Sequence, residues 1–244
     1  NLLQYFFVTL KGLAMGAADV VPGVSGGTIA FISGIYEELI SSINNINFGI
    51  IKTWKNEGFK TMWRKLNGNF LVALFLGIGI SVLSLAKGIS WLLENKPIMV
   101  WAFFFGLVVA SIIVVGKSIQ KWNVGTIIGL ILGAAIAYYI TTLPPNENSG
   151  SMPYLFLSGA LAICAMILPG ISGAFILVLL GSYKTILDAV HEWNFKTIAV
   201  VGSGAIIGLL SFARVLKWMF KHYKNITLAV LTGFIFGSLP KIWP

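Results

Sequence analysis

The sequence has few of the residues that carry catalysis or bind metals. Its 244 residues include one cysteine, two histidines and eight acidic residues. The single thiol, Cys164, forms no internal disulfide, and no Cys/His cluster has the spacing of a metal site. No nucleophile with an orienting partner is visible either. We therefore expect no catalytic residue, no metal ion and no cofactor.

Charge is also scarce, whereas apolar residues are abundant. Hydrophobic residues make up 57% of the chain and charged residues 10%, which is more apolar surface than a globule of this length can bury. The excess of lysine and arginine gives a net charge of +9. Because these residues lie mainly in loops between apolar segments, we expect anionic membrane lipids, and not nucleic acid, as their partner.

The long apolar segments predict an all-α polytopic membrane protein. A helix that crosses a bilayer needs about 20 apolar residues. Five segments approach or exceed that length: 71–93, 98–116, 122–143, 197–217 and 226–239. Regions 1–41 and 153–190 are also apolar, but a Pro-Gly pair interrupts each of them. We predict that each of these two regions forms a pair of short helices that meet at a tip.

The two interrupted regions belong to an internal repeat. The pentapeptide 22–26, Pro-Gly-Val-Ser-Gly, returns 147 positions later as Pro-Gly-Ile-Ser-Gly at 169–173. After an insertion near 50–69 the offset falls to 127, and the matched pairs there include Gly77 with Gly204, Lys87 with Arg214, and Trp91 with Trp218. The chain therefore consists of two copies of one unit.

We divide the chain into a first repeat at 1–116, a connecting transmembrane helix within 117–149, and a second repeat at 150–244. The chain leaves each Pro-Gly region on the same side of the membrane as it entered, whether the two helices re-enter or cross twice. The connecting helix then makes the second repeat start from the opposite face. Inverted-topology repeats of this kind are typical of alternating-access transporters.

Basic residues predict which side is cytoplasmic. The side that holds loops 42–69, 117–121 and 218–225 carries ten lysine and arginine residues, against three on the other side. These loops are cytoplasmic by the positive-inside rule. Within the first loop, apolar residues at helical spacing alternate with basic ones and predict a surface helix over 52–69. Tethering to the inner leaflet is its expected role, and contact with a substrate headgroup is the alternative.

Three motifs suggest a family. They are Gly-Ala-Ala-Asp-Val-Val-Pro-Gly-Val-Ser-Gly-Gly-Thr at 16–28, Gly-Ile-Tyr-Glu at 34–37, and Leu-Pro-Gly-Ile-Ser-Gly at 168–173. Together they resemble the bacterial and archaeal polyprenyl-phosphate transporter family, PopT, over nearly the whole chain. The resemblance implies a cytoplasmic-membrane flippase that returns undecaprenyl phosphate, the lipid carrier of peptidoglycan synthesis, to the inner leaflet. It also implies one more helix after 226–239.

The tips are the predicted phosphate site. A helix start presents unpaired N–H groups and the positive end of a dipole, so helices that begin near Ser25 and Ser172 suit an anion. Glycines allow close approach, and hydroxyls add donors. The predicted phosphate-binding residues at the tips are Gly23, Ser25, Gly26, Gly27, Thr28, Gly170, Ser172 and Gly173. The alternative is a tight re-entrant turn in which serine only caps the helix.

Charged residues inside the apolar segments are further candidates. Lys87 and Arg214 occupy equivalent places in the two repeats and are predicted cationic stations for phosphate, one for each leaflet; the alternative is that both snorkel. Asp19 is a candidate for proton coupling or a partner of Arg214, unless it only bonds the following turn. Glu37 and Lys184 form a predicted gate pair, and a solvated helix end is the alternative for Glu37.

Two other functions stay open. Nothing in the apolar segments encodes a lipid tail, so transport of a small soluble anion is an alternative to a flippase. An intramembrane enzyme acting on lipid phosphates is less well supported, because the residues that such hydrolysis needs are not visible. The sequence leaves the coupling ion and a homodimer open.

Overall fold

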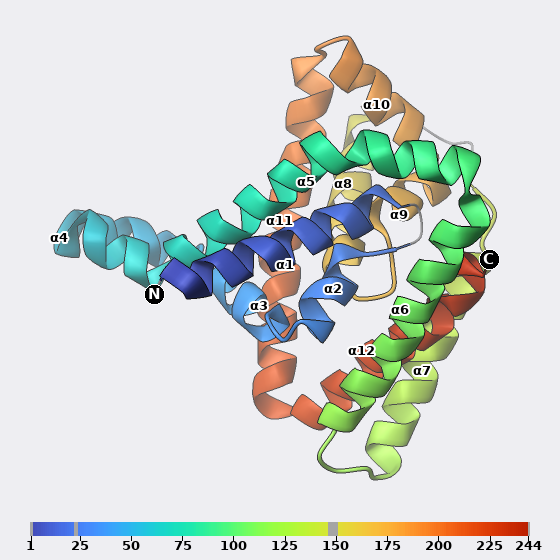
Figure 1. Cartoon of the computed structure of the whole chain (residues 1–244). Helices are drawn as coiled ribbons and strands as arrows, with labels where there is room; N and C mark the ends of the chain where they lie inside the picture. Colours follow the sequence, from blue (N-terminus) through green and yellow to red (C-terminus); the bar gives the residue numbers. More distant parts are fainter. Residues whose placement is uncertain (1, 22–23, 146–150, 244) are drawn as a thin grey trace.

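The computed structural model describes residues 2–21, 24–145 and 151–243, and every regular element in these ranges is a helix (Figure 1). The elements are α1 (Leu2–Val20), α2 (Gly26–Ile32), α3 (Tyr36–Asn44), α4 (Phe48–Lys65), α5 (Gly68–Asn95), α6 (Pro97–Ser118), α7 (Val124–Thr142), α8 (Met152–Ile167), α9 (Gly173–Leu179), α10 (Tyr183–His191), α11 (Phe195–His222), α12 (Lys224–Ser238) and the 3₁₀ helix η1 (Leu239–Ile242).

Five of these helices are long and apolar enough to cross a membrane, namely α5, α6, α7, α11, and α12 together with η1. They correspond to the five apolar segments found in the sequence. An all-helical chain with this set of helices has the architecture of a multi-pass membrane protein.

The element order repeats along the chain. Helices α2 and α3 recur as α9 and α10, which begin 147 positions later and have the same lengths of 7 and 9 residues. Helix α5 recurs as α11, 127 positions later, and both have 28 residues. The offsets are those of the sequence matches, so equivalent residues stand at equivalent places in equivalent helices.

Each Pro-Gly region contains three helices, where the sequence predicted two. The additional break lies at Gly34 in the first region and at Gly181 in the second, where φ is +75° and +66°. These values fall in the left-handed region that glycine adopts without steric cost. Helices α9 and α10 consequently meet at an angle of 110°. The two glycines stand at equivalent positions, 147 residues apart, but no break was predicted at either.

A side chain from the preceding long helix supports each additional break. Lys11 of α1 donates a hydrogen bond from Nζ to the carbonyl of Ser33, at 2.8 Å. In the second repeat the Tyr154 hydroxyl of α8 donates to the carbonyl of Leu180, at 2.7 Å. Ser33 and Leu180 are the equivalent C-caps of α2 and α9. A different donor in each repeat thus satisfies the equivalent carbonyl, which lies at a helix end and lacks an intrahelical partner.

Close packing of α1 on α5 and of α8 on α11 depends on glycine. A Cβ added to Gly77 would collide with the backbone carbonyl of Thr9, and one added to Gly204 with that of Phe156. Gly204 and Phe156 are the repeat counterparts of Gly77 and Thr9, so the same contact occurs in both repeats. Small residues let helix backbones approach in this way within a membrane.

The single surface helix predicted over 52–69 is wrong in detail. Gly58 has φ +83° and ψ 168°, which interrupts α4. Lys65 contacts Glu57 at 2.9 Å and Thr53 at 3.4 Å, which a straight helix cannot achieve across that spacing. Helix α4 is therefore a helical hairpin that projects from the body of the protein (Figure 1).

Candidate phosphate-binding site

The two tips lie against each other in the interior of the protein. The hydroxyl of Ser25 lies 3.2 Å from the carbonyl oxygens of both Met166 and Leu168, to which it donates. Thr28 accepts a hydrogen bond from the backbone N–H of Gly170, at 2.9 Å. Both hydroxyl side chains are buried. The structure therefore brings together predicted residues that stand more than 140 positions apart in the sequence.

Groups of the protein itself already satisfy the start of α2. The N–H of Gly26 donates to Oδ1 of Asp19 at 2.7 Å, and the N–H of Gly27 donates to the Ser25 hydroxyl at 3.1 Å. A Cβ on Gly27 would lie 2.9 Å from the carbonyl oxygen of Ile167, so the C-terminal end of α8 abuts the start of α2. The negative end of one helix dipole thus meets the positive end of another.

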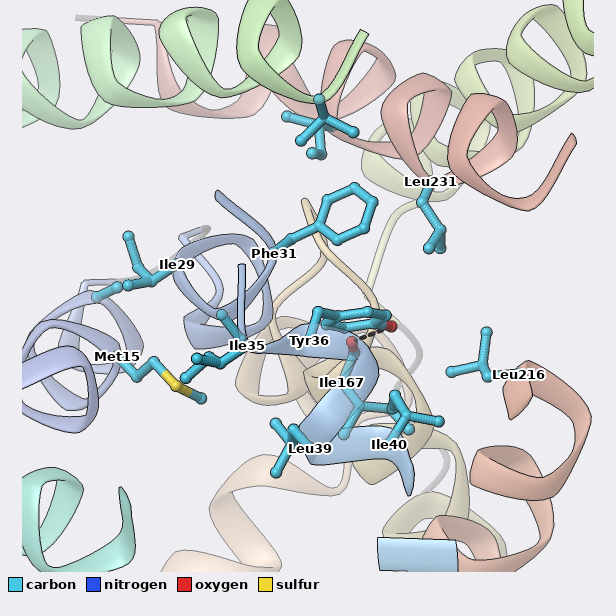
Figure 2. Packing of buried hydrophobic residues seen from close by; sticks show 14 of the residues in the cluster. Met15, Ile29, Phe31, Ile35, Tyr36, Leu39, Ile40, Ile167, Leu216 and Leu231 are labelled. Carbon is cyan, nitrogen blue, oxygen red and sulfur yellow. Dashed lines mark hydrogen bonds between the residues drawn. The ribbon is translucent and has the colours of Figure 1, made fainter. Parts of the chain in front are cut away.

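Tyr36 is the residue of this region whose role sequence reasoning missed. Its hydroxyl donates to the carbonyl of Ile167 at 2.8 Å, and its ring packs edge-on against Phe31 (Figure 2). The ring also packs edge-on against Phe220. The side chain is almost fully buried. Tyr36 stands in the Gly-Ile-Tyr-Glu motif at 34–37 and recurs as Tyr183, 147 positions later. Neither signal indicated a contact with the second tip.

The start of α9 has a different environment. Ser172 is the N-cap of α9, and its side chain makes no capping hydrogen bond. Together with Gly173 and Asp19 it lines a cavity of about 280 Å³ between α8, α9 and α11. The Asp19 carboxylate therefore contacts the start of α2 and also borders the space in front of α9. The hydrogen bond of Asp19 goes to Gly26, the first residue of α2, and proton coupling stays a prediction.

The structure does not place Arg214 with the tips. Its side chain is exposed on α11, and among the described residues no carboxylate forms an ion pair with it. Asp19 is thus not its partner in this conformation. Lys87 lies in α5, and its side chain is outside the described part of the structure, as is the whole of Gly23.

Glu37 pairs with a different lysine from the one predicted. Its carboxylate lies 2.7 Å from Nζ of Lys224, at the start of α12. Lys184 is exposed on α10 and forms no ion pair with Glu37 in the described structure. The reason is positional, because α3 packs beside the end of α11 and the start of α12, whereas Figure 1 places α10 at the other end of α11.

No group of three or more histidine, cysteine or acidic residues is arranged to hold a metal ion in the ranges that the structure describes. The polar groups at the tips are hydroxyls, backbone amides and one carboxylate. Such groups bind and orient an anion or a proton.

Comparison with known proteins agrees with this architecture. The model of the family described as undecaprenyl phosphate translocase-like matches residues 15–244. The chain is 50% identical over 242 residues to a polyprenyl-phosphate transporter of Vibrio cholerae serotype O1, which covers 99% of this chain and 79% of that protein. It is 32% identical to a polyprenyl-phosphate transporter of Staphylococcus aureus, over 96% of this chain and 85% of that one.

No solved structure matches the chain. The family assignment thus depends on sequence, where the match includes both tips, α3 and every helix of membrane-spanning length. With that coverage, this chain belongs to the undecaprenyl phosphate translocase-like family.

Proposed function

We propose that this protein transports undecaprenyl phosphate across the cytoplasmic membrane, so that the lipid carrier is reused in cell-envelope synthesis. The observation that carries the proposal is the 50% identity, over 99% of the chain, to a protein named polyprenyl-phosphate transporter. The family name also refers to translocation, which agrees with a transporter and not an enzyme.

The barrier to this transport is the desolvation of the charged headgroup, because the isoprenoid tail stays in the apolar part of the bilayer throughout. Backbone that is irregular at membrane depth must be satisfied by protein or by a hydrated cavity. We place the phosphate at the second tip, in the cavity beside Ser172 and Gly173. At the border of that cavity the Ser172 side chain makes no capping hydrogen bond, whereas the carbonyls of α8 cover the start of α2.

Asp19 gives this site a route to proton coupling. A carboxylate and a phosphate beside the same cavity repel each other, and protonation of Asp19 removes that repulsion. Binding of the phosphate and protonation of Asp19 would then favour each other. Lys87 and Arg214 would each bind the phosphate near one membrane surface, one of them before and the other after the phosphate passes the tips.

We further propose that the repeats are inverted in the membrane, with loops 42–69, 117–121 and 218–225 in the cytoplasm. The positions of α3 and α10 support this, since they are equivalent in sequence and lie toward opposite ends of the protein (Figure 1). Each Pro-Gly region would then be re-entrant, one from each face.

The test is transport in liposomes that contain undecaprenyl phosphate, with headgroup accessibility followed from outside. We expect the parent protein to redistribute the lipid and Ser172→Ala to slow it by about tenfold, which corresponds to the loss of one hydrogen bond to a charged group. Ser203→Ala, an exposed serine on α11, is the matched control and should transport normally.

Absence of redistribution by correctly inserted parent protein would refute the flippase and favour a soluble-anion transporter. Chemical consumption of the lipid phosphate would favour an intramembrane enzyme.

A further inference from the structure

Helices α3 and α10 are equivalent in sequence but differ sharply in burial. Tyr36 and Ile40 of α3 are 2% and 1% exposed, whereas their counterparts Tyr183 and Leu187 of α10 are 42% and 40% exposed. The residue types are the same or nearly so, and the difference therefore lies in what each helix packs against. Helix α3 is docked on the body of the protein, and its repeat partner is not docked in the same way.

The docking surface of α3 is the junction between α11 and α12. The rings of Tyr36 and Phe220 have centroids 6.0 Å apart, and the Glu37 carboxylate reaches Lys224. The α11–α12 turn is joined to the α6–α7 turn by a hydrogen bond from the N–H of Gln120 to Asn225, at 3.0 Å. Glu37 thus lies where the ends of several helices meet.

Glu37 is surrounded by an excess of positive charge. One cavity of about 250 Å³ is lined by Glu37, Ser41, Lys217 and Lys221. A second, of about 410 Å³, is lined by Glu37, Ser118, Gln120 and Lys224 among others. Three lysines therefore border the space on the two sides of one carboxylate. We call Lys217, Lys221 and Lys224 the lysine cluster.

We propose that the lysine cluster is a binding site for a phosphate monoester on a lipid, and that Glu37 occupies it while α3 is docked. The proposal deepens the proposed function and rests on it. Lysine ammonium groups bind phosphate as point charges. A phosphate monoester carries a charge of about −1.5 to −2 at neutral pH and three acceptor oxygens, so it competes with a single carboxylate for the same lysines.

The charge of the site selects the class of ligand. With Glu37 displaced, three positive charges face the headgroup, which suits a monoester near −2 better than the singly charged phosphodiester of ordinary phospholipids. The hydroxyls of Ser41 and Ser118 and the amide of Gln120 line the same cavities and add neutral donors. Free inorganic phosphate shares this chemistry and must be separated by experiment.

The site exists in only one repeat. At the repeat offsets Glu37 corresponds to Lys184, Lys221 to Glu94, Lys217 to Ser90 and Lys224 to Pro97. The equivalent positions thus hold one cation and one anion, against three cations and one anion in the lysine cluster. The charge that can hold a phosphate headgroup is therefore greater at the end of the protein where α3 is docked.

The test measures binding of farnesyl phosphate to the purified full-length chain in detergent. We expect the double variant Lys217→Gln/Lys221→Gln to weaken binding by about tenfold, and Lys224→Gln to weaken it several-fold. Glu37→Gln, which removes the competing charge and keeps the shape, should tighten binding several-fold. Lys196→Gln, an exposed lysine at the other end of α11, is the control and should bind as the parent does.

Farnesyl methyl phosphate, a diester, and inorganic phosphate complete the comparison. Weaker binding of both supports a lipid monoester site, whereas equally tight binding of either overturns that assignment. Unchanged affinity in both Glu37→Gln and the double lysine variant would overturn the site itself. Transport of undecaprenyl phosphate by the parent protein is measured in parallel. If the parent transports while the variants bind unchanged, the site fails and the proposed function stands; absence of parental transport refutes the function instead.

Discussion

At the scale of single residues, hydroxyl groups hold the two tips together. Ser25, Thr28 and Tyr36 all come from the first repeat, and each bonds a backbone group of the segment 166–170. A hydrogen bond between neutral groups stabilises a protein by about 1 kcal/mol, but a buried carbonyl left without a donor costs about 1–3 kcal/mol. The contact between the tips is therefore sensitive to the loss of a single oxygen atom.

Tyr36→Phe tests this sensitivity. Removing the hydroxyl leaves its hydrogen bond to the Ile167 carbonyl unmade while the ring packing remains, so we expect the free energy of unfolding in detergent to fall by about 1–3 kcal/mol. Tyr183→Phe is the matched control, because Tyr183 is the exposed repeat counterpart. An equal effect of the two substitutions would contradict the role given to the Tyr36 hydroxyl.

Substitutions at Asp19 separate its two roles. Asn keeps an oxygen that accepts from Gly26, so Asp19→Asn should melt close to the parent protein and yet lose the response of transport to a pH gradient. Asp19→Ala loses the acceptor as well, and its stability should fall by about 1–3 kcal/mol. Thermal unfolding and transport with and without an imposed gradient provide the readouts. A gradient response that persists in Asp19→Asn would rule out Asp19 as the coupling group.

At the scale of elements, the sequence predicts the helices of membrane-spanning length well and the broken regions less well. Long apolar runs have a strong signal, since each must satisfy its own backbone in lipid. The break at Gly34 has a weak signal, because a single glycine within a largely apolar stretch is also compatible with a continuous helix. The turn at Gly58 was hidden for a similar reason, as the residues around it kept helical spacing.

Helix packing within each repeat depends on glycine at a few contacts. Gly204→Ala places a methyl group against the backbone of Phe156, so α8 and α11 must separate, at a cost of about 1–3 kcal/mol. Gly202→Ala, two residues away in the same helix, meets open space and should leave stability unchanged or slightly raised. Melting temperatures of the two variants in the same detergent check the difference, and similar values would argue against close packing at Gly204.

At the scale of the whole molecule, the repeats are equal in their elements and unequal in their contacts. Sequence matches predicted the equality, because equivalent residues recur at fixed offsets. They gave no sign of the difference in burial, since Tyr36 and Tyr183 are the same residue type. The partner of Glu37 was likewise unpredictable, because it depends on where α3 docks and not on any local pattern. The hydrogen bonds from side chains of the first tip to backbone groups of the second were also unpredictable, because an alignment of the repeats does not show which residues of one repeat contact the other.

The docked position of α3 gives a prediction for transport. In a Cys164→Ala background, Glu37→Cys and Lys224→Cys joined by a bis-methanethiosulfonate reagent should hold α3 against α12. If α3 must leave before the lysine cluster can bind the headgroup, the linked protein loses transport by at least about tenfold, and reductant restores it. Each single cysteine variant treated with the reagent is a control. Full transport by the linked protein would mean that α3 stays docked throughout the cycle.

The bonds between the tips also have a consequence for how the protein is made. Ser25, Thr28 and Tyr36 enter the membrane during synthesis well before the segment 166–170 exists. Until that segment arrives, their hydroxyls lack the partners that the finished protein supplies, which is unfavourable in lipid. The first repeat is therefore an incomplete insertion intermediate that matures only when α8 follows. A chain divided between α7 and α8 should accumulate its two halves when they are produced together, whereas the first half alone should be degraded.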